Sequence, residues 1–155
     1  MRPMPDSVAE FLKGERLVVA GVSRRPQHFA NAIFRKLHSA GHEVVPLNPN
    51  AQEAEGVRCY PDLASVPGQI DGVVAAMHPA ASLALVRQAA ERGVEKVWFH
   101  RLMGTGSVSR EAVSECHSRG IRCIVGGCPL MYVEPVDPFH KCFRWILTWS
   151  GGVRG

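Results

Sequence analysis

The chain has 155 residues, of which 46% are hydrophobic and 21% charged, as expected for one globular domain over residues 1–155. Its net charge of +4 comes from scattered Lys and Arg residues, which favours a small phosphorylated ligand over nucleic acid. No stretch predicts a signal peptide or a membrane span, and the five cysteines form no Cys-x-x-Cys pair, so we expect free thiols in the cytoplasm rather than disulfides or a zinc site.

Short apolar runs alternate along the chain with segments of helical periodicity. The runs are rich in β-branched residues, which is typical of strands buried on both faces of a parallel sheet. Gly41, Gly93 and Gly120 follow helical segments, where a residue with positive φ commonly ends a helix. The expected elements are a helix at 7–12, a strand at 17–22, a helix at 29–37, strands at 43–47 and 71–77, a helix at 83–90, a strand at 95–100, a helix from 107 or 109 to Gly120, a strand at 121–125 and a helix at 139–149.

This alternation predicts an α/β fold, because parallel strands need crossover connections and these are right-handed. We expect a Rossmann-like three-layer α/β/α architecture with a five-stranded parallel sheet in the order 3-2-1-4-5, plus N-terminal and C-terminal helices. Ligands of such sheets bind beyond the carboxyl ends of the strands, near the point where the strand order reverses. The segments expected to meet there are 21–26, 48–50, 77–79, 100–106 and 126–129.

The turn after the first strand has the composition of a phosphate site. Gly21 allows a tight turn, and Ser23, Arg24 and Arg25 place a hydroxyl and two positive charges beside the start of a helix. The alternative is an ordinary turn whose arginines are solvated.

Two features of a standard dinucleotide site are missing. The first turn does not continue as Gly-x-Gly-x-x-Gly, and the second strand ends in Asn48 and Pro49 instead of an acidic residue for the ribose. This argues against NAD. A site for the 2′-phosphate of NADP, using Arg24 or Arg25, remains an alternative.

Several short segments resemble, in their order and spacing, the coenzyme A (CoA) binding domain family. They are 19–23 with Pro26, 45–49, 56–63, 71–74, 97–98 and 120–129, which together cover roughly residues 14–130 and leave 131–155 as a C-terminal extension. This family has a Rossmann-like fold similar to the N-terminal domain of the succinyl-CoA synthetase alpha subunit. The resemblance implies CoA or an acyl-CoA as the ligand.

The resemblance also implies which residues hold the ligand. The first turn would hold the phosphates, the segments after the second and third strands would flank the nucleotide and the pantetheine arm, and the end of the fourth strand would border the same groove. Where family members often have a basic residue after Asn-Pro, this chain has Asn50, and Arg25, His78 or Arg101 would compensate. The implied cofactor-binding residues are Gly21, Val22, Ser23, Arg24, Arg25, Pro26, Asn48, Pro49, Met77, His78, Pro79, Trp98, Phe99, His100 and Arg101.

Three residues at strand ends raise the question of chemistry. His78, His100 and Cys128 are compatible with a histidine-activated thiol, with a metal site, or with a buried cysteine beside ordinary loop histidines. The third interpretation is favoured, so no catalytic or metal-binding residue is predicted. We therefore expect non-catalytic binding of CoA or acyl-CoA; the alternatives are an NADP-dependent oxidoreductase and a scaffold protein with a vestigial nucleotide cleft.

The C-terminal segment predicts an amphipathic helix. Apolar residues recur there at helical spacing, and Trp145 adds aromatic surface outside the main stripe. The helix either packs on the sheet or forms a homodimer face. The recurring residues are Phe139, Cys142, Phe143, Ile146 and Trp149.

Overall fold

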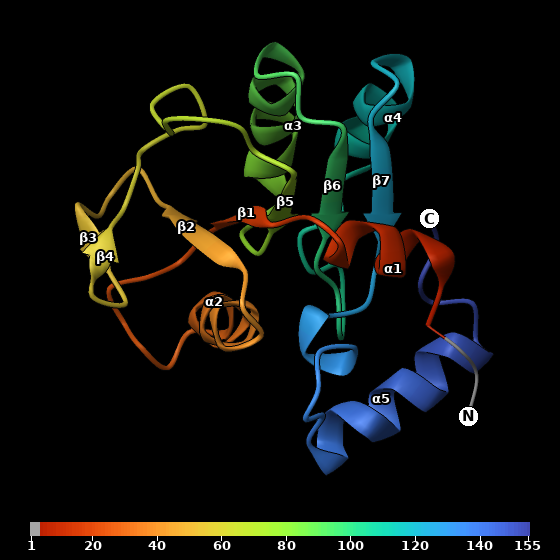
Figure 1. Ribbon diagram of the computed structural model, residues 1–155. Coiled ribbons are helices and arrows are strands. Elements are labelled where there is room, and N and C mark those ends of the chain that lie inside the picture. The colour runs from red at the N-terminus through yellow and green to blue at the C-terminus, as the bar shows by residue number, and fades with distance from the viewer. Residues whose placement is uncertain (1–3) are drawn as a thin grey trace.

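The computed structural model describes residues 4–155, which form a central parallel sheet with helices on both faces (Figure 1). The sheet contains β1 (Arg16–Ala20), β2 (Glu43–Leu47), β5 (Gly72–Ala75), β6 (Lys96–Phe99) and β7 (Arg122–Val125), and β3 (Glu53–Ala54) pairs with β4 (Val57–Arg58) in a separate hairpin. The helices are α1 (Asp6–Leu12), α2 (Phe29–Ser39), α3 (Ser82–Glu91), α4 (Arg110–Ser118) and α5 (Pro138–Trp149), and the 3-10 turns are η1 (Pro79–Ala81) and η2 (Pro129–Met131).

The predicted fold class is confirmed, and the predicted strand order is corrected. The sheet runs β2-β1-β5-β6-β7 with every pair parallel, so the third strand of the sheet lies next to the first, on the side away from the second. In the numbering of the five predicted strands, the order is 2-1-3-4-5 instead of 3-2-1-4-5. The order therefore reverses between β1 and β5, and this is the switch point where a ligand is expected.

Two sequence features explain the corrected order. Pro46 cannot donate a backbone hydrogen bond, which suits an edge strand such as β2 and disfavours an interior one. The connection from β2 to β5 packs Leu63 and Val66 with Val18 of β1, on the face of the sheet opposite α2. It thus carries the chain across β1, and all four residues of β5 are buried as befits an interior strand.

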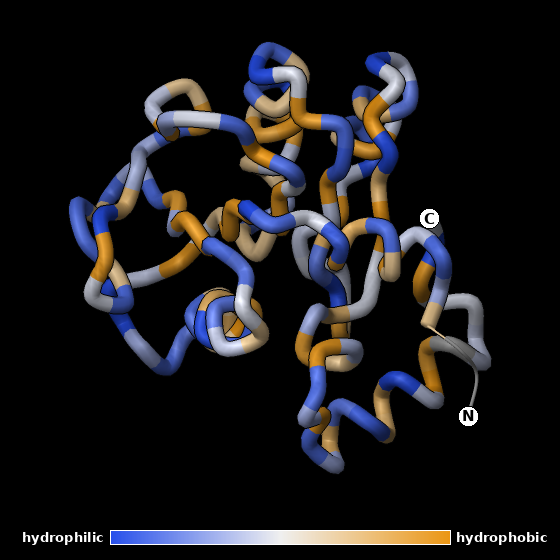
Figure 2. The backbone as a smooth tube through the Cα atoms, in the orientation of Figure 1, coloured by the Kyte–Doolittle hydropathy of each residue, from blue (hydrophilic) through white to orange (hydrophobic). Residues whose placement is uncertain are grey.

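The two faces of the sheet hold two separate hydrophobic clusters. On one face, α1, α2 and η2 cover side chains such as Leu17, Val19 and Trp98. On the other, α3 and α4 cover Val18, Val73 and Phe99. Alternation along each strand explains this division, since successive side chains point to opposite faces. Figure 2 shows the strands of the sheet as largely hydrophobic, whereas the β3–β4 hairpin mixes hydrophilic and hydrophobic residues.

The chain after the sheet forms α5 and then returns to the edge of β7. Arg154 and Val125 exchange two backbone hydrogen bonds of 2.7 and 3.0 Å, as in an antiparallel bridge. The outer face of α5 carries exposed aromatic side chains, among them Trp145 and Trp149. Across residues 4–155, no helix has both the length and the apolar character needed to cross a membrane.

Candidate functional site

The turn after β1 joins the carboxyl ends of three strands. Gly21 has a φ of +101°, and its N–H donates to the carbonyl of Leu47 at the end of β2, with an N···O distance of 2.8 Å. A Cβ at this position would overlap the carbonyl of Ala76, which follows β5. Glycine is therefore required both by the backbone conformation and by the close approach of the neighbouring strand.

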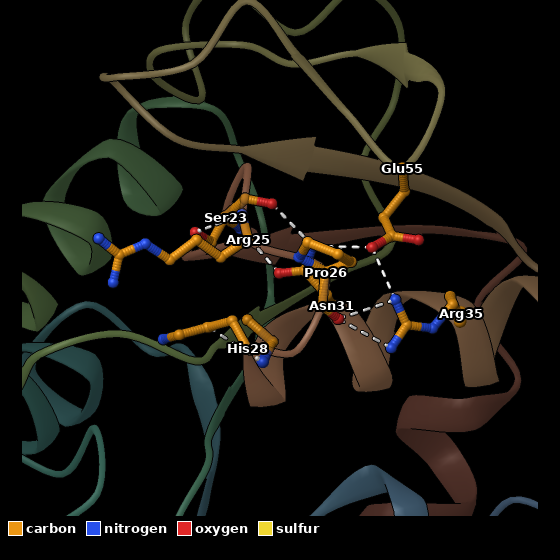
Figure 3. A network of polar contacts seen from close by, with 8 residues as sticks. Ser23, Arg25, Pro26, His28, Asn31, Arg35 and Glu55 are labelled. Atoms are coloured by element: carbon orange, nitrogen blue, oxygen red, sulfur yellow. Dashed lines mark hydrogen bonds and ion pairs between the residues drawn. The ribbon is translucent and has the colours of Figure 1, made fainter.

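Asn31 holds the loop that follows Gly21. This side chain, in the first turn of α2, is 1% exposed. Its Oδ1 accepts from the N–H of Ser23 (2.8 Å), and its Nδ2 donates to the carbonyl of Ser23 and to Oε1 of Glu55 (2.7 Å each). Figure 3 shows these contacts around the loop. Because every partner is a fixed polar group, the position of residue 23 is set by α2 rather than by solvent.

Glu55 links this loop to the β3–β4 hairpin. Its carboxylate accepts from Arg35 Nη1 (2.7 Å) as well as from Asn31, and Arg35 also donates to the carbonyl of Pro26 (3.1 Å). Beside these contacts lies a hollow of about 270 Å³. The side chain of Arg25 points away from the network (Figure 3), and both Arg24 and Arg25 are exposed. The hollow is lined by Ser23, Arg24, Pro26, Asn31, Glu53, Ala54, Glu55 and Gly56.

Asn48, which directly follows β2, connects the end of this strand to the loop after β1. Its Nδ2 donates to the carbonyl of Val22 (2.8 Å), and its Oδ1 accepts from the N–H of Asn50 (2.8 Å). Val22 itself is fully buried, so it offers a ligand no exposed side chain. Pro49 is exposed beside Asn48. The segments after β1 and β2 therefore lie side by side, and Asn48 fixes the position of the loop after β1.

Ser107 holds the segment that follows β5. Its hydroxyl accepts from the N–H of Met77 (2.9 Å) and donates to the carbonyl of the same residue (2.7 Å). Its own carbonyl accepts from the hydroxyl of Ser82, which is buried in α3. His78 is exposed and caps η1, where Nδ1 accepts from the N–H of Ala80, and Pro79 begins that turn.

His100 lies buried at the end of β6 and stacks on an exposed ring. Its ring centroid is 4.9 Å from that of Phe29, at an interplanar angle of 19°, and the ring of His28 also packs on Phe29, with centroids 4.4 Å apart. Nδ1 of His100 has no hydrogen-bond partner among the described residues. Burial, followed by repulsion from His140 and His28, lowers the pKa of His100 to about 4. The imidazole is therefore neutral at pH 7.

This lowered pKa predicts an acid-sensitive fold. As the pH falls below about 6.5, the unfolded chain takes up a proton at His100 that the folded chain takes up only near pH 4, so the free energy of unfolding decreases. The loss is about 3 kcal/mol at pH 4 relative to pH 7.5. Urea unfolding of the native chain and of His100→Gln across this range measures it. The variant should lose less stability than the native chain; equal losses would contradict the prediction.

The remaining predicted residues contribute less to the surface. Trp98 and Phe99 are fully buried, and Trp98 Nε1 donates to the carbonyl of Gly126 (2.9 Å), so neither side chain borders a groove as the resemblance implied. Arg101 Nη2 donates to the carbonyl of Gly152. Burial raises the pKa of Cys128 to about 12, which keeps its thiol protonated and argues against an activated thiol there.

The structure thus adds Asn31, Arg35, Glu55 and Ser107 to the candidate site. Each acts by holding a loop at the carboxyl edge of the sheet. Only one of them carries a signal in the sequence: Asn31 is a polar residue in the first turn of a predicted helix, beside its apolar face. The other contacts join residues far apart in the chain, which local patterns do not report.

Comparison with known families matches residues 15–134 to the family described as CoA binding domain, a range that includes the loops that follow β1, β2, β5 and β6. The chain belongs to this family. The match ends before α5, so the exposed aromatic helix lies outside the part that defines the CoA-binding domain.

Relatives of this CoA-binding domain include parts of larger proteins. YneT of Bacillus subtilis is 33% identical over 70 residues, which make up 44% of this chain and 52% of YneT. The alpha subunit of an ADP-forming acetate–CoA ligase II from Pyrococcus furiosus is 25% identical over 126 residues, or 76% of this chain and 27% of the subunit. The chain therefore spans about half of one curated relative and about a quarter of the other.

Solved structures resemble the CoA-binding domain closely. A protein from Pyrococcus horikoshii superposes with a TM-score of 0.76 at 27% identity, over 83% of this chain and 92% of its own. The dinucleotide-forming acetyl-coenzyme A synthetase 1 of Candidatus Korarchaeum cryptofilum superposes with a TM-score of 0.61 at 28% identity, over 70% of this chain and 25% of its own.

Proposed function

We propose that this chain binds CoA or an acyl-CoA, without catalysing a reaction, at the carboxyl edge of its sheet. The observation that carries the proposal is the loop from Gly21 to Pro26, which Asn31 fixes at the start of α2 and which exposes two arginines. Backbone N–H groups and positive charge at a helix start attract phosphate groups. We place the diphosphate of CoA against this loop.

The comparisons support the ligand class. The Pyrococcus ligase and the Korarchaeum synthetase both carry CoA in their names, and the part that this chain shares with each is about a quarter of the larger protein. Binding is therefore proposed without the chemistry of the whole enzymes. With Trp98 buried, the exposed ring of Phe29 is the apolar surface against which we place the pantetheine arm.

Thermal unfolding with added nucleotides tests the proposal. CoA at 100 times its dissociation constant should raise the free energy of unfolding by about 2.7 kcal/mol, which is visible as a higher melting temperature. Replacing Arg24 and Arg25 together by Ala should weaken binding about tenfold or more, because a hydrogen bond to a charged group contributes about 1.5–3 kcal/mol. Arg122→Ala, an exposed arginine at the amino end of β7, is the matched control and should bind normally.

Two outcomes would contradict the proposal. Stabilisation by NADP and none by CoA would favour an oxidoreductase that uses the same arginines for a 2′-phosphate. No effect of CoA, acetyl-CoA, NADP or ADP would favour a scaffold with an empty cleft.

We further propose that α5 forms a homodimer face. Phe139, Trp145, Ile146 and Trp149 are 45–74% exposed, and the rings of Trp145 and Trp149 stack with centroids 6.2 Å apart. Replacing both tryptophans by Ser should give a monomer, since aromatic residues dominate the energy of such interfaces. Sedimentation equilibrium measures the mass. Met103→Ser, at another exposed apolar residue, is the control, and a native chain that sediments as a monomer contradicts the proposal.

We also propose a cytoplasmic location. All five cysteines are free thiols, which suits a reducing compartment. Localisation of a tagged chain by cell fractionation tests this directly.

A further inference from the structure

A second hollow, of about 510 Å³, lies beside the outer strand β7. It is lined by residues of α1, of the end of α4 and of the strand itself, and it shares no residue with the hollow beside the loop after β1. Phe11 and Ile124 give it an apolar interior, and Lys96, Arg122, Asp6 and Glu10 supply charges to its lining. The CoA proposal assigns this space no role.

A cysteine and a histidine face this hollow together. Cys123 of β7 and His117 of α4 both line it, and Cys123 Sγ lies 3.6 Å from His117 Nε2. Cys123 is 8% exposed, so the hollow is its access to solvent. A nucleophile within hydrogen-bonding reach of a histidine is the usual arrangement of an activated thiol.

A second cysteine packs in the same hydrophobic cluster as the first. This is Cys116, which lies in the last part of α4 and is fully buried. The turn between α4 and β7 brings them together, since the N–H of Ile121 donates to the carbonyl of Cys116 (2.8 Å). The two cysteines are seven residues apart in the sequence, so they do not form the Cys-x-x-Cys motif that is typical of redox-active pairs.

The two thiols have opposite acid strengths. The interaction with the Cys116 thiol, and then the neighbouring His117, lower the pKa of Cys123 below the usual range. The same interaction, with burial and the charge of Glu115, raises the pKa of Cys116. Burial also raises the pKa of Cys59, so Cys123 differs from both of these buried thiols. A thiolate beside a protonated thiol is the pairing that thiol–disulfide exchange requires.

We propose that Cys123 and Cys116 form a redox-active dithiol that reduces small disulfides entering the hollow beside β7. The sulfur of Cys123 attacks one sulfur of a disulfide R–S–S–R, which forms a mixed disulfide and releases RS⁻. Cys116 gives up its proton to the released RS⁻, and its sulfur attacks Cys123 Sγ. This forms the Cys116–Cys123 disulfide and releases the second RS⁻, so the two protein thiols supply the two electrons that reduce the disulfide.

The experiment treats the fully reduced chain with bis(2-hydroxyethyl) disulfide, a small uncharged probe, in the absence of oxygen. Remaining thiols are then alkylated in acid, and the modified peptides are identified by mass spectrometry. We expect a mixed disulfide on Cys123 first and a Cys116–Cys123 disulfide afterwards. Exposed Cys142, which has the ready access that Cys123 lacks, is the internal comparison.

Variants separate the two steps. Cys116→Ser should stop at the mixed disulfide on Cys123, and Cys123→Ser should leave Cys116 reduced. Cys59→Ser removes another buried thiol and should change neither step. In the native chain, alkylation of Cys123 should level off at a lower pH than the value near 8.5 of an ordinary thiol, and His117→Gln should move this point upward.

The proposal is wrong if Cys142 is modified while Cys116 and Cys123 stay reduced, or if the mixed disulfide on Cys123 is not resolved in the native chain. The native chain alone decides this, so a variant that fails to fold does not affect the test. CoA binding plays no part in it, and neither result bears on that proposal.

Discussion

Replacing Gly21 by Ala should lower the free energy of unfolding by about 3 kcal/mol or more. Two costs add at this position. An alanine is strained at a φ of +101°, and its Cβ would overlap the carbonyl of Ala76, so β1 and β5 would have to separate at the point where the strand order reverses. Urea unfolding measures the change.

The control is Gly93→Ala. Gly93 also has a positive φ, of +68°, but a Cβ there would have no neighbour within 4 Å. It should cost about 1 kcal/mol, the price of the backbone conformation alone. If both variants lose the same stability, the close approach of residues 21 and 76 does not constrain the fold.

Replacing Asn31 by Ala should cost about 3 kcal/mol and should also weaken CoA binding about tenfold or more. The variant leaves the N–H and the carbonyl of Ser23 without their part-buried side-chain partner, and Glu55 keeps only its contact with Arg35 of α2. The stability loss follows from the lost contacts. The affinity loss follows because the loop that we assign to the diphosphate is no longer held in one position.

Denaturant unfolding and calorimetric titration with CoA measure the two effects separately. Asn50→Ala, in the exposed loop after β2, is the matched control and should change stability by less than about 0.5 kcal/mol. If Asn31→Ala loses stability but binds CoA with unchanged affinity, Asn31 stabilises the fold and the loop from Gly21 to Pro26 is not part of the CoA site.

The fold class was predictable because its signals are local. Each buried strand is a short apolar run, and each helix has apolar residues at helical spacing, as in α2, where Ile33, Phe34 and Leu37 are buried. Periodicity reports burial directly. The order of the strands is a long-range property, and the only local signal for it was Pro46, whose missing N–H marks β2 as an edge strand.

The candidate site was predictable only in part. Gly21, Asn48 and Met77 do lie at one edge of the sheet. Asn48 donates to the carbonyl of Val22, next to Gly21, and a Cβ on Gly21 would lie 3.1 Å from the Cβ of Met77. Position along the chain did not report the direction of side chains at the end of β6, where Trp98 and Phe99 point into the two cores instead of toward the edge. Nor did it report Glu55 or Arg35, whose role depends on contacts 20 or more residues apart.

The outer edges of β2 and β7 are partly paired with other segments of the chain, and this affects how copies of the chain can associate. The N–H of Tyr60 donates to the carbonyl of Pro46 on the outside of β2, and on the outside of β7 the pairing of Val125 with Arg154 occupies part of the strand. An open sheet with free edges recruits strands from other molecules and aggregates. With both edges partly occupied, strand pairing between copies of this chain is hindered, so the dimer that we propose would have to form through a helical surface such as α5.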